Sequence, residues 1–162
     1  MRYLVQEKLL HIGEDNDILD ENGQPTLRVD GKALSLRDLM IVQDLGGTEV
    51  ARVNRKLVSL MPCYEIAFAQ GGNAEVQKHF SPLQQKWTIS EGGQGELEMR
   101  GNFLAHDFTI TRSGSLVATI SKAWVSLTAT YGVEVAPGEN DLLVLCSVLA
   151  LEAEQQREHR SR

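Results

Sequence analysis

The chain of 162 residues is long enough for one domain that buries its own core without metal ions or disulfide staples. Hydrophobic residues make up 42% of it and charged residues 23%, values that describe a soluble globular protein. The formal net charge of −6 argues against unspecific binding to nucleic acid and against adsorption to anionic lipid through bulk charge.

The N-terminal segment lacks the apolar run of a signal peptide, so we expect a cytoplasmic protein with no transmembrane segment. Cys63 and Cys146 form neither a metal-binding spacing nor a disulfide framework, which predicts two reduced thiols in the core. The four histidines are far apart in sequence and show none of the paired spacings of zinc sites. We therefore predict no metal and no cofactor.

From Tyr3 to Val135, short alternating segments are separated by turn residues about every ten positions, a pattern typical of an antiparallel sandwich or barrel. Asn22-Gly23 is a strong hairpin signal, and further turns are predicted at Gly101-Asn102 and Ser113-Gly114. The clearest alternation comes last, where one face is expected to hold Leu127, Ala129, Tyr131, Val133 and Val135.

The segment Leu142–Leu151 has Ser147 as its only polar side chain and therefore has no polar face. It is shorter than the roughly 20 residues that span a bilayer, so it is predicted to be buried in protein. Its length and flanks favour a helix, although periodicity alone does not exclude a buried strand. From Glu152 onward the helix is expected to enter water. Residues 1–154 would form the single domain and residues 155–162 a polar tail.

Few folds accommodate strands that each have one apolar face together with a helix that is apolar on all sides. A flat sheet would leave half of the helix in water. The sequence therefore predicts a mainly β protein, a closed antiparallel β-barrel of about 10 to 12 strands that encloses the C-terminal apolar α-helix.

Four segments also resemble a known family, and they occur in its order: Leu34–Asp38, Arg55–Ile66, Ile120–Trp124 and Tyr131–Glu134. They are similar to motifs of the LURP-one-related family of the tubby C-terminal-like superfamily, which includes the phospholipid scramblases. The resemblance implies the same architecture, a barrel around a central helix.

The chain departs from these relatives at positions that bear on function. Scramblases carry acidic residues, proposed to bind calcium, just before the segment similar to Tyr131–Glu134, whereas this chain has uncharged residues at 127–130. The scramblase C-terminal helix is proposed to enter the membrane, whereas here Glu152 and Glu154 follow the apolar run. The basic pocket with which tubby proteins bind phosphoinositides has no residue-by-residue match.

Three basic residues are candidates for lipid or anion binding. Arg52 and Lys56 share one face of a predicted strand, since adjacent residues point to opposite faces, and the alternative is a solvated strand surface. Lys122 would share a face with Trp124, where structural packing is the alternative. If Arg55 points inward, a carboxylate or backbone carbonyls must surround it.

Neither a phosphate-cradling glycine loop nor a nucleophile elbow is present in the sequence, so we predict no enzymatic activity and no catalytic residues. The preferred hypothesis is a cytoplasmic binding or interaction module. The family resemblance implies a membrane phospholipid or phosphoinositide headgroup as its ligand. The alternatives are a small-ligand carrier or enzyme with a pocket at the barrel mouth, and a protein–protein adaptor.

Overall fold

The structure, a computed structural model, describes residues 1–6, 16–30, 39–92, 95–102, 105–126 and 130–160. The family-like segment Leu34–Asp38 and residues 127–129 lie outside these ranges. The strands within them are β1 (Arg2–Gln6), β2 (Asn16–Asp20), β3 (Pro25–Asp30), β4 (Leu39–Gln43), β5 (Glu49–Arg55), β6 (Cys63–Phe68), β7 (Asn73–His79), β8 (Gln85–Glu91), β9 (Glu96–Asn102), β10 (Asp107–Arg112), β11 (Ser115–Ser121) and β12 (Thr130–Val135).

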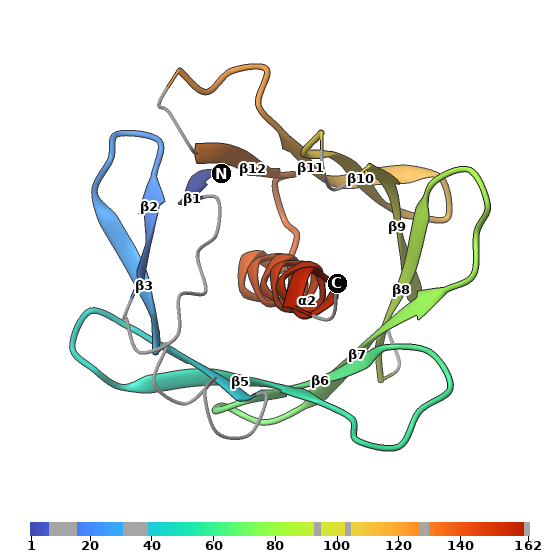
Figure 1. Cartoon of the computed structure of the whole chain (residues 1–162). Coiled ribbons are helices and arrows are strands. Elements are labelled where there is room, and N and C mark those ends of the chain that lie inside the picture. Colours follow the sequence, from blue (N-terminus) through green and yellow to red (C-terminus); the bar gives the residue numbers. More distant parts are fainter. Residues whose placement is uncertain (7–15, 31–38, 93–94, 103–104, 127–129, 161–162) are drawn as a thin grey trace.

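The twelve strands close into one antiparallel barrel, as the alternating pattern predicted (Figure 1). Each strand pairs with its neighbours in the sequence, and β1 closes the ring against β12, with Arg2 opposite Glu134 and Gln6 opposite Thr130. Closure removes the unpaired edges that an open sheet of this size would expose.

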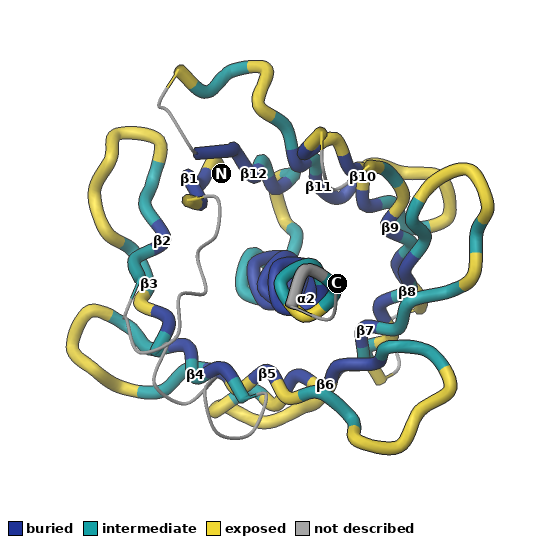
Figure 2. Tube along the Cα trace, in the orientation of Figure 1, coloured by how far each residue is buried: buried dark blue, intermediate teal, exposed yellow. Residues whose placement is uncertain are grey.

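The helix α2 (Asp141–Arg160) runs along the inside of the ring, which confirms the predicted central helix (Figure 1). Every residue from Leu143 to Glu154 is buried. Asn140 caps its start, because the Asn140 side-chain oxygen accepts a hydrogen bond of 3.1 Å from the Leu143 amide. Figure 2 shows the buried positions on the barrel strands and on α2, and the exposed ones mainly on the turns.

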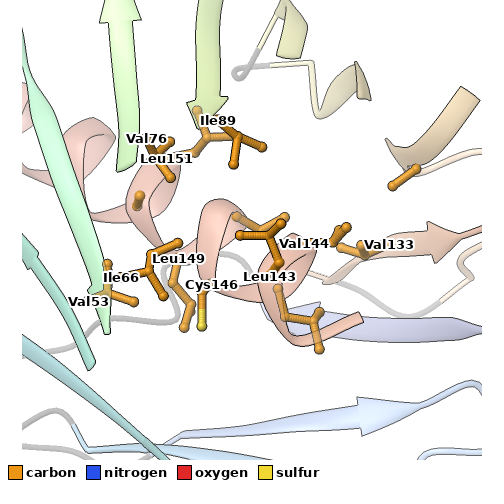
Figure 3. Packing of buried hydrophobic residues seen from close by; sticks show 14 of the residues in the cluster. Val53, Ile66, Val76, Ile89, Val133, Leu143, Val144, Cys146, Leu149 and Leu151 are labelled. Atoms are coloured by element: carbon orange, nitrogen blue, oxygen red, sulfur yellow. The ribbon is translucent and has the colours of Figure 1, made fainter. Parts of the chain in front are cut away.

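The helix packs against apolar side chains that several strands point inward (Figure 3). Leu149 lies beside Ile66 of β6, Leu151 beside Val76 of β7, and Val144 beside Val133 of β12. These contacts come from different sides of the ring, which is why α2 needs an apolar surface all round.

The expectation that the helix enters water after Leu151 is wrong. Glu152 and Glu154 are only 3% and 4% exposed, because both carboxylates find partners inside the barrel. The residues after 154, expected to form a polar tail, continue the helix as far as Arg160.

The predicted turns at Asn22-Gly23 and Ser113-Gly114 are confirmed, with φ of 83° at Gly23 and 84° at Gly114. The predicted turn at Gly101-Asn102 is wrong, since both residues are the end of β9. A glycine is needed there for another reason. A Cβ atom on Gly101 would lie 2.0 Å from the carbonyl oxygen of Asp107 on the paired strand.

Candidate functional site

Arg52 lies on the outer side of β5, Lys56 follows directly after that strand, and carboxylates pair with both. Arg52 Nε donates a hydrogen bond of 2.8 Å to Glu49 Oε1, and this bond raises the pKa of Arg52. Lys56 Nζ is 2.5 Å from Glu75 Oε1 and 3.4 Å from Glu65 Oε1, and these hydrogen bonds raise the pKa of Lys56. Both charges are therefore largely balanced locally.

Lys122, the third basic candidate, lies on another side of the barrel. It follows β11, and five strands separate β11 from β5 in either direction around the ring. The structure therefore does not bring Lys122 together with Arg52 and Lys56 in one site.

Trp124, two residues beyond Lys122, covers the outside of the β1–β12 pair. A Cβ atom on Gly132 would lie 2.2 Å from Trp124 Cζ2, so the absence of a side chain at Gly132 makes room for the indole. The Arg2 guanidinium stands over the indole at 4.9 Å from the ring centre, a cation–π contact. This arrangement favours the packing interpretation of the Lys122–Trp124 segment.

The end of the barrel at which α2 ends is here called the mouth, and two cations of the described residues, Arg55 and Lys78, face inward there. Arg55 Nε is 3.4 Å from Glu154 Oε1, which meets the expectation that an inward Arg55 would have a carboxylate beside it. Lys78 Nζ is 2.7 Å from Glu158 Oε1 and stands over the ring of Trp87 at 5.9 Å from its centre. Two ion pairs thus tie the last turns of α2 to β5 and β7.

A further buried carboxylate, that of Glu152, accepts a hydrogen bond of 2.7 Å from Tyr131 Oη. The ring of Tyr131 stacks on His106, with 4.6 Å between ring centres. The Tyr131–Glu152 bond joins β12 to α2 across the interior of the barrel.

Five large apolar side chains, here called the apolar tips, stand in solvent on two loops at the mouth: Leu57, Val58, Leu60, Phe80 and Leu83. Each is at least 84% exposed, and Leu60 is completely exposed at 105%. The loops that carry them are neighbours, because the Lys78 amide donates a hydrogen bond of 2.9 Å to the carbonyl of Pro62. So many exposed apolar side chains on neighbouring loops are unusual on a protein surface, which makes the apolar tips the candidate contact site.

The apolar tips were not predicted from the sequence. Leu57 and Leu60 lie in the family-like segment Arg55–Ile66, and that motif does not indicate whether their side chains are buried. The available signal was that these apolar residues lie between two strands and do not alternate with polar ones.

A pocket of about 490 Å³ adjoins the apolar tips at the mouth, between the β7–β8 loop and the end of β9. We call it the mouth pocket, and its described lining is Met61, Lys78, His79, Phe80, Ser81, Pro82, Leu83, Gln84, Gln85, Gly101 and Asn102. A second pocket of about 490 Å³, here called the far pocket, lies beside the start of α2. Its lining includes the three carboxylates of Asp44, Glu49 and Glu91.

Both cysteines are free and buried, as predicted. Burial raises the pKa of the Cys146 thiol to about 12 and also raises that of Cys63. Within the described ranges, no three His, Cys, Asp or Glu side chains gather where they could hold a metal ion. In the same ranges, no helix combines the length and the apolar character that crossing a bilayer requires.

The chain is similar to a named bacterial protein and to a plant protein of known structure. The chain is 29% identical to "Uncharacterized protein YxjI" of Bacillus subtilis (strain 168) over 147 residues, which cover 91% of this chain and 88% of the relative. Its fold is similar to the X-ray structure of a protein from Arabidopsis thaliana, with a TM-score of 0.62 and 13% sequence identity. That match covers 96% of this chain and 91% of the plant protein, and it shows the fold alone.

The family model described as LURP-one-related matches residues 1–152, which is nearly the whole chain. The match includes all twelve strands and the buried part of α2. It agrees with the order of motifs in the sequence and with the closed barrel around α2. The chain belongs to the LURP-one-related family.

Proposed function

We propose that the protein is a non-enzymatic module that binds the surface of phospholipid membranes through the apolar tips. The observation that carries this proposal is the exposure of five large apolar side chains on neighbouring loops at one end of the barrel. Leaving them in water is unfavourable, and moving them into the acyl boundary of a bilayer recovers part of that free energy.

The shape and the charge of these loops favour lipid over a protein surface. The apolar tips protrude, so a protein partner would need a matching hollow, whereas lipid adapts to any protruding side chain. The segments 57–61 and 80–84 contain no charged residue, and Lys56 precedes the first of them. A net charge of −6 disfavours adsorption through overall charge, so the apolar contact must supply most of the affinity.

The absence of enzymatic activity is part of the proposal. A carrier or enzyme that holds its ligand inside the barrel needs room there. Here α2 occupies the barrel interior, and its buried side chains form one continuous core with those of the strands.

Two free buried thiols suit a reducing compartment, which supports a cytoplasmic location.

The basic residues Arg52, Lys56 and Lys122 are secondary in this proposal. Glu49, Glu65 and Glu75 stand beside the first two and weaken their attraction for a headgroup. Headgroup contact by these residues remains part of the hypothesis only as a supplement to the apolar tips.

The experiment compares Leu57→Ser/Leu60→Ser with the wild type in co-sedimentation with phospholipid vesicles. Each inserted leucine should contribute about 1 to 2 kcal/mol, so the double variant should bind roughly 30-fold more weakly or worse. The matched control is Leu45→Ser, which removes an exposed leucine from the β4–β5 turn at the opposite end of the barrel and should bind like the wild type. Equal binding of the double variant and the wild type would contradict the proposal.

A protein partner is the alternative occupant of the same surface. If the wild type does not bind vesicles at all, the lipid function is wrong. Sedimentation velocity would then show whether the apolar tips drive self-association that Leu57→Ser/Leu60→Ser removes. That outcome would favour the adaptor hypothesis.

A further inference from the structure

The mouth pocket lies where the barrel wall meets the apolar tips. Phe80 and Leu83 belong both to the tips and to its lining, and the inward-facing Lys78 and the end of β9 complete its wall. Its volume of about 490 Å³ is within the range of small-molecule sites, which is roughly 300 to 1,000 Å³. It is therefore large enough for a headgroup or a small metabolite.

The charge of the lining is unusual for this protein. The chain has 22 acidic and 16 basic residues, yet the described lining of the mouth pocket contains Lys78 and no Asp or Glu. The far pocket, of the same volume, has three carboxylates. We propose that the mouth pocket is a binding site for a phosphate group, as carried by a phospholipid headgroup or by a soluble phosphate ester.

The polar side chains of the pocket suit a phosphate. Lys78 supplies the positive charge, the Ser81 hydroxyl is a donor, and the carboxamides of Gln84, Gln85 and Asn102 supply N–H groups. A phosphate offers at least three acceptor oxygens to such donors, and hydrogen bonds between charged partners are the stronger ones.

Among the described residues, Glu158 is the carboxylate that pairs with Lys78, and it must share that cation with the ligand. Its carboxylate lies 2.7 Å from Lys78 Nζ and holds the side chain at the mouth, over the ring of Trp87. An ammonium group has three N–H donors, so it can bind Glu158 and a phosphate oxygen together. Glu158 should therefore weaken the binding of a phosphate without preventing it.

The apolar part of the lining indicates what the phosphate is attached to. Phe80 and Leu83 border the pocket on the side of the apolar tips, so a ligand with a phosphate and an apolar part would contact both. If the phosphate belongs to a phospholipid, which we call the lipid form of the inference, the site depends on the proposed membrane function. If it belongs to a soluble phosphate ester, the soluble form, the site does not depend on that function. Experiments can separate the two forms.

The first measurement is calorimetric titration of the full chain with inorganic phosphate and with sn-glycerol 3-phosphate. Gln85→Glu adds a negative charge to the pocket at nearly constant volume and retains the acceptor for the Trp87 indole N–H, which donates to Gln85 Oε1 at 3.4 Å. It should weaken binding about tenfold or more, whereas Glu158→Gln should tighten it about threefold. The matched control is Gln70→Glu, the same change in the far pocket, which should bind as the wild type does.

The second measurement is co-sedimentation with vesicles of phosphatidylcholine alone and with one third phosphatidylglycerol. Stronger binding to the anionic vesicles, lost in Gln85→Glu and retained in Gln70→Glu, supports the lipid form. Binding of the soluble phosphates without that preference supports the soluble form. If Gln85→Glu matches Gln70→Glu in both measurements, or if the wild type neither binds the soluble phosphates nor prefers anionic vesicles, the inference is wrong. Binding to phosphatidylcholine would still support the proposed function in that case.

Discussion

Arg55 and Glu154 form an ion pair inside the mouth of the barrel, with Nε of Arg55 3.4 Å from Oε1 of Glu154. The pair joins β5 to α2 across 99 positions of sequence. The side chain of Glu154 is 5% exposed and that of Arg55 19%, so the carboxylate is buried and the guanidinium is still reached by water. The apolar helix therefore ends in a charged section that stays within the barrel.

Removing either partner of this pair should destabilise the protein, because it leaves a largely buried charge without its counter-ion. We expect Arg55→Met to lower the free energy of unfolding by about 2 kcal/mol, less than the roughly 3 to 5 kcal/mol of a fully buried pair because water reaches Arg55. The double variant Arg55→Met/Glu154→Met should lose less free energy of unfolding than the two single variants lose together. Urea unfolding of the four proteins in this cycle measures the coupling.

The exposed pair of Arg52 and Glu49 is the control for that cycle. The same substitutions there, Arg52→Met and Glu49→Met, should show no measurable coupling, since water screens both groups. Additive losses at Arg55 and Glu154 would mean that the buried pair does not stabilise the helix end.

Gly132→Ala should disturb the outer surface of β12 through Trp124. A methyl group at Gly132 cannot coexist with Trp124 Cζ2 at 2.2 Å, so the indole must move away and lose its contact with Arg2. We expect a loss of about 1 to 3 kcal/mol and a red shift of the tryptophan emission. In a Trp124→Ala background, Gly132→Ala should change the free energy of unfolding little. An equal loss in both backgrounds would show that the backbone, and not the indole, requires the glycine.

Tyr3→Phe should lower stability at neutral pH by about 1 kcal/mol, because Tyr3 Oη donates a hydrogen bond to the Asp141 carboxylate at the start of α2. Burial, followed by the hydrogen bond and the charge of Asp141, raises the pKa of Tyr3 above its usual value of 10.0. Stability that depends on the neutral phenol is therefore complete below pH 10 and is lost as the pH rises through the higher pKa of the folded state. Chemical unfolding measures the free energy of unfolding of both proteins. The difference between wild type and variant should be smaller at pH 10.5 to 11 than at pH 7. A difference that widens with pH would contradict this assignment.

Cys146 should not react with iodoacetamide at pH 8 while the protein is folded. With a pKa of about 12, only about one thiol in ten thousand is a thiolate at that pH, and the barrel wall also excludes the reagent. Mass spectrometry should find Cys146 unlabelled in the native protein and fully labelled in guanidinium chloride. Labelling of Cys146 at the same rate in both conditions would show that α2 is not enclosed.

The sequence by itself determined the strands that alternate clearly and the nature of the helix. Alternation such as that of Leu97 and Met99 against Glu98 depends only on neighbouring residues, so one buried face can be identified without the fold. The apolar surface all round α2 likewise predicts enclosure. Together with the family motifs, these local patterns were sufficient to predict a closed barrel around the helix.

Only the tertiary structure decided the environment of residues whose partners are distant in sequence. Glu152 and Glu154 are polar and predict exposure, yet Tyr131 and Arg55 allow both to be buried. The apolar tips show the reverse, since leucine at 57 and 60 predicts burial and the structure leaves both in water. The free energy of each of these side chains depends on which groups the closed ring brings next to it, and no local pattern contains that information.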